Sequence, residues 1–446
     1  MARKGRKVAL VAHPGCSLLE LVAAQSAWST AAMMSSLETV VVGATTEFMP
    51  SSTPLSFKPQ KTFAEVPDPD VLIVVGGGES TGVPHEDPEL MEYVRNAAGR
   101  AFVVGSTGTG SLILAAAGLL DGRTATTHWA FRKQLEAAGV AYRRASWVED
   151  GKYITGAGSS AAIDMSLKLI ARLRSQRLAR RVQIIIEWDP NPPFGAIDWA
   201  TADTAAPLAA PQTNAAEPRH IALVIYPGLT VLDLVGPLEA VAALSRARPE
   251  FVPVVVAEHT SPVTSDDDLT FLPNGTYEDF PAPDVLIVPG GGRPTLRAMS
   301  NPALRQYLRS ASTAASTTAS VCTGALLLAS IGRLKGCDAT THWAYHRYLP
   351  AFGARYVQQR WVRNNGIINS AGVSAGIDMA LQLVAELTNE ATARRVQLAL
   401  HYDPDPPFGG IHYKQLPPLM RTVRALMTLT VPAYTRRPRQ LLRRGA

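Results

Sequence analysis

The sequence predicts an α/β protein with two tandem domains, each built on a parallel β-sheet that helices cover on both faces. Three observations support this fold class. The chain has 446 residues, which is enough for two or three domains. Segments of its first half recur in its second half in the same order. Within each half, continuous apolar runs of strand length alternate with helical segments, which is typical of buried parallel strands.

The internal repeat covers nearly all of both halves, and its spacing hardly drifts. Glu20 and Asp233 are 213 residues apart, and His128 and His342 are 214 apart. A period this long indicates a duplicated globular domain rather than a solenoid of small repeats. The matching segments are 7–22 with 220–235, 69–78 with 283–292, 125–131 with 339–345, 162–173 with 376–387, and 180–197 with 394–411.

Composition sets the boundaries of the domains. We expect a first domain at 1–200, a linker at 201–218, a second domain at 219–413 and a basic tail at 414–446. The linker is rich in Ala, Pro and Thr and has no apolar periodicity. The tail has eight basic residues and no acid, so it accounts for the net charge of +6.

The elements of the second copy follow in order from local patterns. Unbroken apolar runs that end at Pro-Gly or at glycines predict strands, and helical periodicity predicts the segments between them. A run of small residues, TTASVC, predicts a strand that leads directly into a helix closed by Gly332. The predicted strands are 221–226, 252–258, 285–288, 317–322 and 367–372, and the predicted helices are 232–244, 303–311, 323–332 and 376–388.

Overall composition excludes several classes of protein. With 46% apolar and 18% charged residues, the chain is not expected to be disordered. It has no apolar stretch of about 18 residues, so we expect no membrane span. The first apolar run stops at His13-Pro14, which is too short for a signal peptide. Three cysteines do not form a disulfide framework and favour a cytoplasmic protein. We expect no metal site and no cofactor.

Cys322 is the candidate nucleophile. It ends a predicted strand and precedes a helix, and its small neighbours allow a sharp turn that exposes the side chain. The positive end of the helix should lower the pKa of the thiol. The alternative is a buried cysteine that packs as a small apolar residue.

Three other features meet Cys322 at the carboxyl ends of the predicted strands, where ligands bind in such sheets. The turn Gly290-Gly291-Gly292 offers free backbone N–H groups to a developing anion. Asp233 lies on the first turn of a helix, and His342 starts a strand after the helix that follows Cys322. Considered singly, each has an alternative interpretation. Asp233 could be an acid that the helix dipole favours in a first turn, and His342 could be a polar residue whose hydrogen bonds are satisfied at a strand start.

Five motifs carry a family resemblance: PGLTVLDLVGPLE, PDVLIVPGGG, CTGALLLASIGRL, ATTHWA and SAGVSAGIDMAL. Together they resemble the ThiJ/PfpI superfamily, which implies a flavodoxin-like, class I glutamine amidotransferase-like fold for each copy. The chain is most similar to isonitrile hydratases and to the sensor domains of AraC-type regulators. The resemblance implies Cys322 as nucleophile, Thr323 beside it, Asp233 as acid/base partner, and Gly290 and Gly291 in the anion pocket.

The resemblance implies a cysteine-dependent small-molecule enzyme, a lyase in which the thiolate attacks an isonitrile carbon. The substrate could also present another electrophilic carbon, such as that of a reactive aldehyde or enone, for hydration or related lyase or cyclisation chemistry. In the isonitrile case the sulfur forms a thioimidate. Water then displaces the sulfur, and a formamide leaves. One alternative is a ligand-sensing regulator, although the 33 residues after Tyr413 are too few for a two-motif DNA-binding module. The other is a deglycase or stress protein, whose members carry Glu where this chain has Asp233. Nucleic acid is not an expected partner.

The first copy lacks the nucleophile. Alignment puts Gly108 opposite Cys322, Thr109 opposite Thr323, Glu20 opposite Asp233 and His128 opposite His342. We therefore expect an inactive first site whose domain serves as the partner in an intramolecular pseudo-dimer. A pocket for a second ligand is the alternative, and further homodimerisation stays open.

Overall fold

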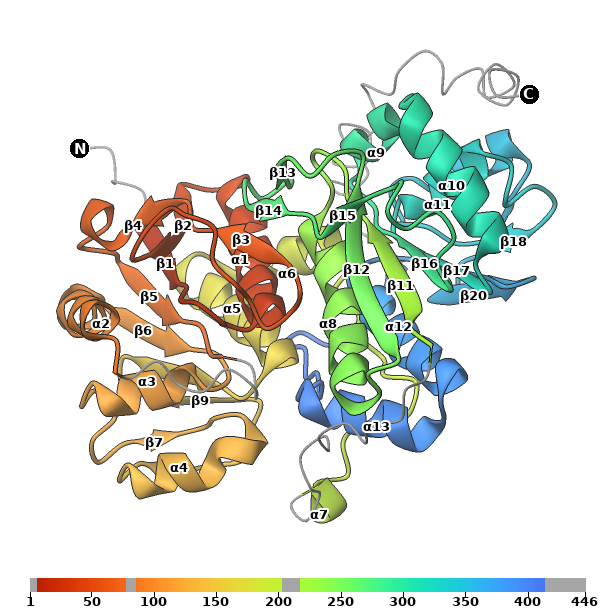
Figure 1. The fold of residues 1–446 in the computed structure, drawn as a ribbon. Coiled ribbons are helices and arrows are strands. Elements are labelled where there is room, and N and C mark those ends of the chain that lie inside the picture. Colours follow the sequence, from red (N-terminus) through yellow and green to blue (C-terminus); the bar gives the residue numbers. More distant parts are fainter. Residues whose placement is uncertain (1–5, 78–85, 203–216, 414–446) are drawn as a thin grey trace. The chain divides into compact units, whose positions relative to one another are not determined.

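The computed structural model describes residues 6–77, 86–202 and 217–413, and these form two compact α/β units (Figure 1). The predicted tail at 414–446 and most of the predicted linker lie outside the described residues. The first unit takes Met1–Ile186, Phe194–Ala209 and Arg394–Gly409, and the second takes Glu187–Pro193, Ala210–Ala393 and Gly410–Ala446.

The first unit is built on a seven-stranded sheet of order β4-β2-β1-β5-β6-β10-β9. The strands run parallel except for β9, which pairs antiparallel with β10. The strands of this sheet are β1 (Arg6–Val11), β2 (Leu37–Gly43), β4 (Lys61–Thr62), β5 (Val71–Val74), β6 (Val103–Ser106), β9 (Trp147–Asp150) and β10 (Tyr153–Gly156). Three short strands lie outside it: β3 (Ser56–Lys58), β7 (Thr124–Ala125) and β8 (Ala141–Tyr142).

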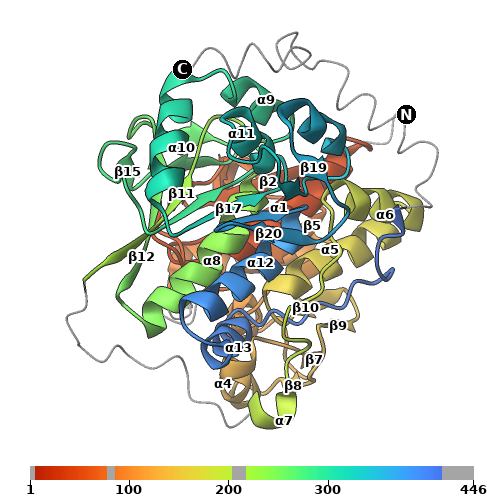
Figure 2. The ribbon, with the colours of Figure 1, turned by 90° about the vertical axis from the view of Figure 1, so that its right-hand side faces the viewer.

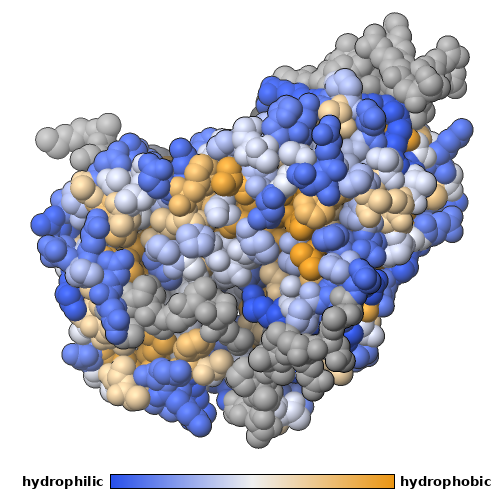
Figure 3. Space-filling model, in the orientation of Figure 1, coloured by the Kyte–Doolittle hydropathy of each residue, from blue (hydrophilic) through white to orange (hydrophobic). Residues whose placement is uncertain are grey.

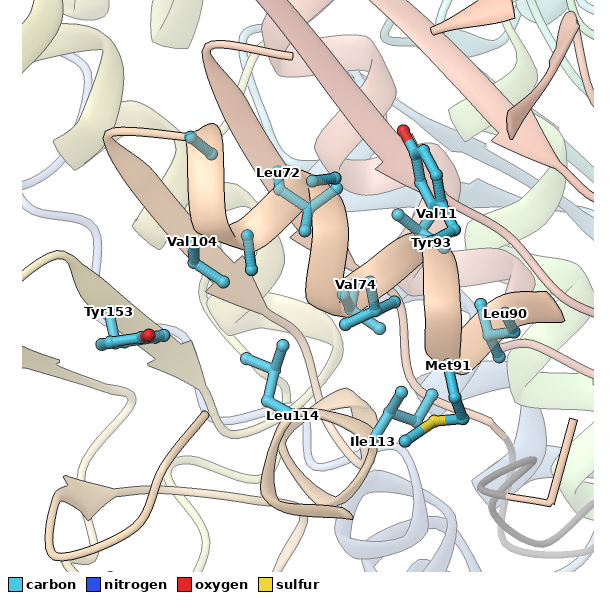
Figure 4. Packing of buried hydrophobic residues seen from close by; sticks show 14 of the residues in the cluster. Val11, Leu72, Val74, Leu90, Met91, Tyr93, Val104, Ile113, Leu114 and Tyr153 are labelled. Atoms are coloured by element: carbon cyan, nitrogen blue, oxygen red, sulfur yellow. The ribbon is translucent and has the colours of Figure 1, made fainter. Parts of the chain in front are cut away.

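Helices cover both faces of this sheet. The helices are α1 (Leu18–Ala32), α2 (Pro88–Arg100), α3 (Gly110–Ala116), α4 (Arg132–Ala137), α5 (Ser159–Leu173), α6 (Gln176–Ile185) and α7 (Trp199–Ala202), with short turns η1 (Phe63–Glu65) and η2 (Trp129–Phe131). Figure 4 shows the core under α2 and α3, where Leu90 of α2 and Ile113 of α3 belong to the same buried cluster as Leu72 and Val74 of β5. Because α1 and α5 pack together against the other face, the central strands are buried on both sides.

The second unit repeats this sheet in the order β15-β12-β11-β16-β17-β21-β20, again with one antiparallel pair, β20 with β21. Its strands are β11 (Arg219–Val224), β12 (Phe251–Ala257), β13 (Val263–Thr264), β14 (Thr270–Leu272), β15 (Gly275–Thr276), β16 (Val285–Val288), β17 (Thr317–Val321), β18 (Asp338–Ala339), β19 (Arg355–Tyr356), β20 (Trp361–Asn364) and β21 (Ile367–Ser370).

In the second unit, α8 and α12 pack side by side on one face of the sheet (Figure 2). Its helices are α8 (Val231–Ala247), α9 (Arg293–Ala298), α10 (Pro302–Ala314), α11 (Gly324–Ser330), α12 (Val373–Leu387) and the turn η3 (His346–Phe352), and α13 (Glu390–Ala399) follows. The predicted fold class is confirmed. The predicted elements of the second copy did not include α9, the antiparallel edge strand β20 or the short strands β13, β14, β15, β18 and β19.

The two units exchange two short segments. Residues 187–193, which follow α6, belong to the second unit, and residues 394–409, which begin within α13, belong to the first. In the second unit, the backbone N–H of Asp189 donates to Ser374 Oγ (3.0 Å). In the first unit, the equivalent N–H of Asp403 donates to Ser160 Oγ (3.2 Å). The first segment therefore packs at the start of α12 and the second at the start of α5, each in the unit that the other repeat mainly forms. The predicted boundaries, drawn as continuous ranges, contain no such exchange.

The face shown in Figure 3 is mostly hydrophilic, with small apolar patches between charged side chains. Met33 and Phe102 are the large apolar side chains that stay exposed in the described part of the chain. Among the described residues, no helix has the length and apolar character that crossing a membrane requires.

Candidate active site

Cys322 occupies a sharp turn between β17 and α11, as the sequence predicts. Its φ is +56°, a left-handed conformation that is strained for a side chain with a Cβ. Its N–H donates to Ser370 O of β21 (3.0 Å), which fixes the turn to the sheet. Gly324, two residues after Cys322, has no space for a side chain. A Cβ there would lie 3.0 Å from Pro289 O and closer still to Val288 O. Only glycine therefore lets α11 start this close to β16.

The thiol of Cys322 is not the acidic group that its helix position suggested. Only 7% of the residue is exposed, and burial raises the pKa of the thiol well above its usual value. The nearby carboxyl groups of Asp233 and Glu187 raise it further, while the Thr323 N–H lowers it. The expectation of a lowered pKa is wrong, because α11 has only seven residues and acids surround the sulfur. Forming the thiolate therefore requires a base that accepts its proton.

Asp233 is placed to be that base. It lies in the first turn of α8, is fully buried, and its Oδ2 would lie 2.8 Å from a Cβ at Gly290. Burial raises the pKa of Asp233 to about 7, against the opposing effects of the Cys322 thiol and the Gly290 backbone. Among the described residues, neither carboxylate oxygen has a hydrogen-bond partner of good geometry. The carboxyl group is therefore poised to change protonation near neutral pH.

A different acid caps α8. Asp266 accepts the Val231 N–H at Oδ1 (3.3 Å) and the Thr230 hydroxyl at Oδ2 (2.7 Å). The helix therefore does not need the Asp233 carboxylate as a cap, and the alternative interpretation of Asp233 loses its structural basis.

The glycine turn is arranged differently from the expectation. The N–H groups of Gly291 and Gly292 both donate to Thr323 Oγ1, at 3.0 and 2.9 Å. The Thr295 hydroxyl lies 2.8 Å from the same oxygen. These two N–H groups are thus not free to bind an anion, and the Thr323 hydroxyl locks the turn instead. The Thr323 backbone N–H remains as the donor beside the sulfur.

His342 faces a residue that sequence reasoning missed. It lies in the loop after β18, not at a strand start, and its Nε2 is 3.7 Å from Glu187 Oε2. The neighbouring Thr341 hydroxyl donates to Cys322 O (2.7 Å), so the loop is fastened to the nucleophile turn. The structure thus groups Cys322, Asp233 and Thr323 closely and sets His342 beside Glu187.

Glu187 is a second buried acid of this site. It is 4% exposed, and burial raises its pKa to about 8. Its φ is +53°, and the Tyr413 hydroxyl donates to Oε1 (3.1 Å). The one signal in the sequence is an acid that interrupts the apolar run VQIIIEW, at the position of His401 in the second copy.

Glu187 also lines a cavity of about 310 Å³, a volume within the range of small-ligand sites. Aromatic side chains line it, with amide and charged groups between them. The Arg360 guanidinium there pairs with the buried Asp378 carboxylate. The lining residues include Trp343, Tyr356, Tyr413, His346, Gln358 and Gln359. No cluster of His, Cys, Asp and Glu in the described ranges could hold a metal ion.

The corresponding site of the first unit has no thiol. Gly108 has φ +45°, and a Cβ there would lie 2.7 Å from Glu20 Oε2 and closer still to Oε1. The Thr109 hydroxyl accepts the Gly77 N–H (2.8 Å), as Thr323 does in its turn. His128 lies with its ring centroid 5.3 Å from that of His401. The longer acid therefore fills the space in which a nucleophile would stand.

Comparisons with known proteins agree with this architecture. The DJ-1/PfpI family model matches residues 6–172 and 219–386. An isonitrile hydratase from Pseudomonas putida is 42% identical over 189 residues, which are 42% of this chain and 81% of that enzyme. The HTH-type transcriptional regulator CdhR from Pseudomonas aeruginosa is 38% identical over 118 residues, 25% of this chain and 34% of the regulator. A crystal structure of a THiJ/PfpI family protein from Pseudomonas syringae covers 52% of this chain and 97% of its own, with a TM-score of 0.46 and 35% identity.

Proposed function

Because this chain belongs to the DJ-1/PfpI family, we propose that its second repeat is a cysteine-dependent enzyme that hydrates an isonitrile or a related electrophilic carbon. The observation that carries the proposal is a strained, buried Cys322 beside the buried, near-neutral Asp233. Similarity to the isonitrile hydratase of P. putida supports the substrate class.

In the proposed reaction, the Asp233 carboxylate takes the thiol proton as the sulfur bonds to the isonitrile carbon. That proton then passes to the same carbon, which gives a thioimidate, R–N=CH–S–Cys322. Water adds to the thioimidate carbon, the C–S bond breaks, and an N-substituted formamide leaves while the thiol is restored. A soft sulfur nucleophile suits this carbon, and a carboxyl group near pKa 7 suits the proton transfers.

We assign no turnover to the first repeat. Gly108 supplies no side chain, and the Glu20 carboxylate occupies the adjacent space. A second candidate function for the active repeat is ligand sensing without turnover. The similarity to CdhR favours it, although the match covers only about a third of that regulator's length.

Incubation with benzyl isonitrile tests the proposal, with N-benzylformamide followed by NMR. We expect product with the wild-type chain and none with Cys322→Ala. Cys337→Ala is the matched control, since it also removes a thiol but lies in a partly exposed bend directly before β18. Saturable binding without formamide would favour the sensing function, and turnover by Cys322→Ala would refute the role of the nucleophile.

A further inference from the structure

Glu187 comes from the end of the first repeat and packs in the second unit. Its Oε1 accepts a hydrogen bond from Tyr413. Its Oε2 has no hydrogen-bond partner within the described ranges and lies 3.7 Å from His342 Nε2. A buried carboxyl oxygen left in this state is costly for stability, which indicates a role other than packing.

The backbone makes room for this carboxyl group. A Cβ at Gly372 would lie 2.6 and 2.8 Å from Glu187 Cβ and Cδ, and closer still to Oε2. Glu187 itself keeps φ at +53°. Close approach and backbone strain together hold the acid at the wall of the cavity, near enough to Cys322 that its charge raises the pKa of the thiol.

The positive charge that acts on Glu187 is that of Arg360, which is already paired with other groups. Arg360 lowers the pKa of Glu187, but its guanidinium is engaged by Asp378 and by the carbonyl of Asp189. The carboxyl groups of Asp233 and Asp189 oppose a charge on Glu187. The titratable groups that face Glu187 are His342, Tyr413, Tyr356, Arg360, Asp189, Asp233 and Cys322.

We propose that Glu187 is the proton donor of the Cys322 site, supplied by the first repeat and working with Asp233 as the base. This inference rests on the proposed function. When water adds to the thioimidate, Asp233 takes a proton from the water and Glu187 gives its proton to the nitrogen. The adduct is then R–NH–CH(OH)–S–Cys322. As the C–S bond breaks, the sulfur recovers a proton from Asp233, and Glu187 takes the hydroxyl proton as the formamide forms.

The two carboxyl groups suit these opposite roles. Burial raises the pKa of Asp233 to about 7 and that of Glu187 to about 8, so each carboxyl group can hold or release a proton near neutral pH. In the first unit, His401 takes the position of Glu187 and Gly108 takes the position of Cys322. A donor acid therefore accompanies the repeat that has the nucleophile.

The test is Glu187→Gln in the full chain, with benzyl isonitrile as the probe. Formation of the thioimidate does not require Glu187, but its hydration does. We expect kcat to fall by about 100-fold or more, and intact-protein mass spectrometry to show the substrate mass accumulating on Cys322. The fall in activity on the alkaline side, expected near pH 8 in the wild type, should disappear. His401→Gln makes the same replacement at the equivalent position of the other unit and should keep wild-type kinetics.

Tyr413→Phe covers the case in which Glu187→Gln does not fold. It removes a hydrogen bond that lowers the pKa of Glu187, so the alkaline fall should move to higher pH. An unchanged pH profile in Tyr413→Phe would overturn the inference. Wild-type turnover by Glu187→Gln, without an accumulated adduct, would overturn it while leaving the proposed function intact. Absence of both adduct and formamide with the wild-type chain would overturn the proposed function and this inference together.

Discussion

Replacing Gly108 with cysteine would place a thiol in the first repeat where Cys322 stands in the second. The backbone conformation alone does not prevent this, because Cys322 itself has φ +56° and Gly108 has φ +45°. The obstacle is the Glu20 carboxyl group. A Cβ at Gly108 would lie 2.7 Å from Oε2 and 2.9 Å from Cδ, where unstrained contacts exceed 3.0 Å. Glu20 is 5% exposed, so it has little room to move aside.

The expected destabilisation has two parts. The left-handed conformation costs a residue with a Cβ roughly 1–2 kcal/mol relative to glycine. Forcing extra atoms into a packed site costs about 1–3 kcal/mol. Gly108→Cys should therefore lower the free energy of unfolding of the first unit by roughly 2–5 kcal/mol. Glu20→Asp shortens the acid by one methylene, to the length of Asp233. It should therefore recover most of the stability lost to the overpacked site.

Urea unfolding of the wild type, both single variants and the double variant forms a double-mutant cycle. Hydrogen exchange of peptides covering α3 assigns the transition to the first unit. We expect a coupling energy of about 1 kcal/mol or more between the two positions, and thiol labelling at position 108 in the double variant. Gly108→Cys within about 0.5 kcal/mol of the wild type, or a double variant no more stable than Gly108→Cys alone, would refute the steric argument.

Four further outcomes are expected. Cys322→Ala should abolish turnover while the melting temperature changes by only a few degrees, measured by calorimetry. Burial raises the pKa of Asp233 in the folded protein to about 7, well above the ordinary value of an aspartate, so its contribution to stability is lost as pH rises from about 4 to 7. At about 1.4 kcal/mol per pKa unit, urea titrations should show a loss of up to about 4 kcal/mol in the wild type and a flatter profile in Asp233→Asn. Gly372→Ala should push Glu187 aside and slow turnover at least tenfold in steady-state assays, with the thiol still reactive. Asp266→Ala should cost about 1 kcal/mol of stability in urea titrations with kcat unchanged, because it removes a helix cap.

Local pattern was enough to predict the five central strands of the second copy, its main helices and the turn at Cys322. Each depends on neighbouring residues: apolar runs for β11 and β16, and small residues around the nucleophile. The acidity of the thiol could not be predicted in the same way. A sequence shows the helix start after Cys322, but not the burial and the two carboxyl groups that raise its pKa.

The role of Glu187 was hidden for a different reason. Its partners His342 and Tyr413 are more than 150 residues away in sequence, and they meet it only because the segment 187–193 packs in the second unit. Alignment of the repeats placed Glu187 opposite His401 and thereby suggested membership of the first domain. Ser160 and Ser374 are equivalent in the two repeats, and so are Asp403 and Asp189, which they bind. A sequence comparison therefore cannot tell which segment packs in which unit.

The exchanged segments also impose an order of events during synthesis. The bond between Ser160 and Asp403 joins residues 243 positions apart, so the first unit cannot be completed until the second has been translated. At roughly 5–20 residues per second, this is a delay of about 12–50 s, during which the docking groups at the start of α5 stay unpaired. Contacts so distant in sequence also slow folding. A ribosome that stalls before Arg394 therefore leaves the first unit without its closing segment.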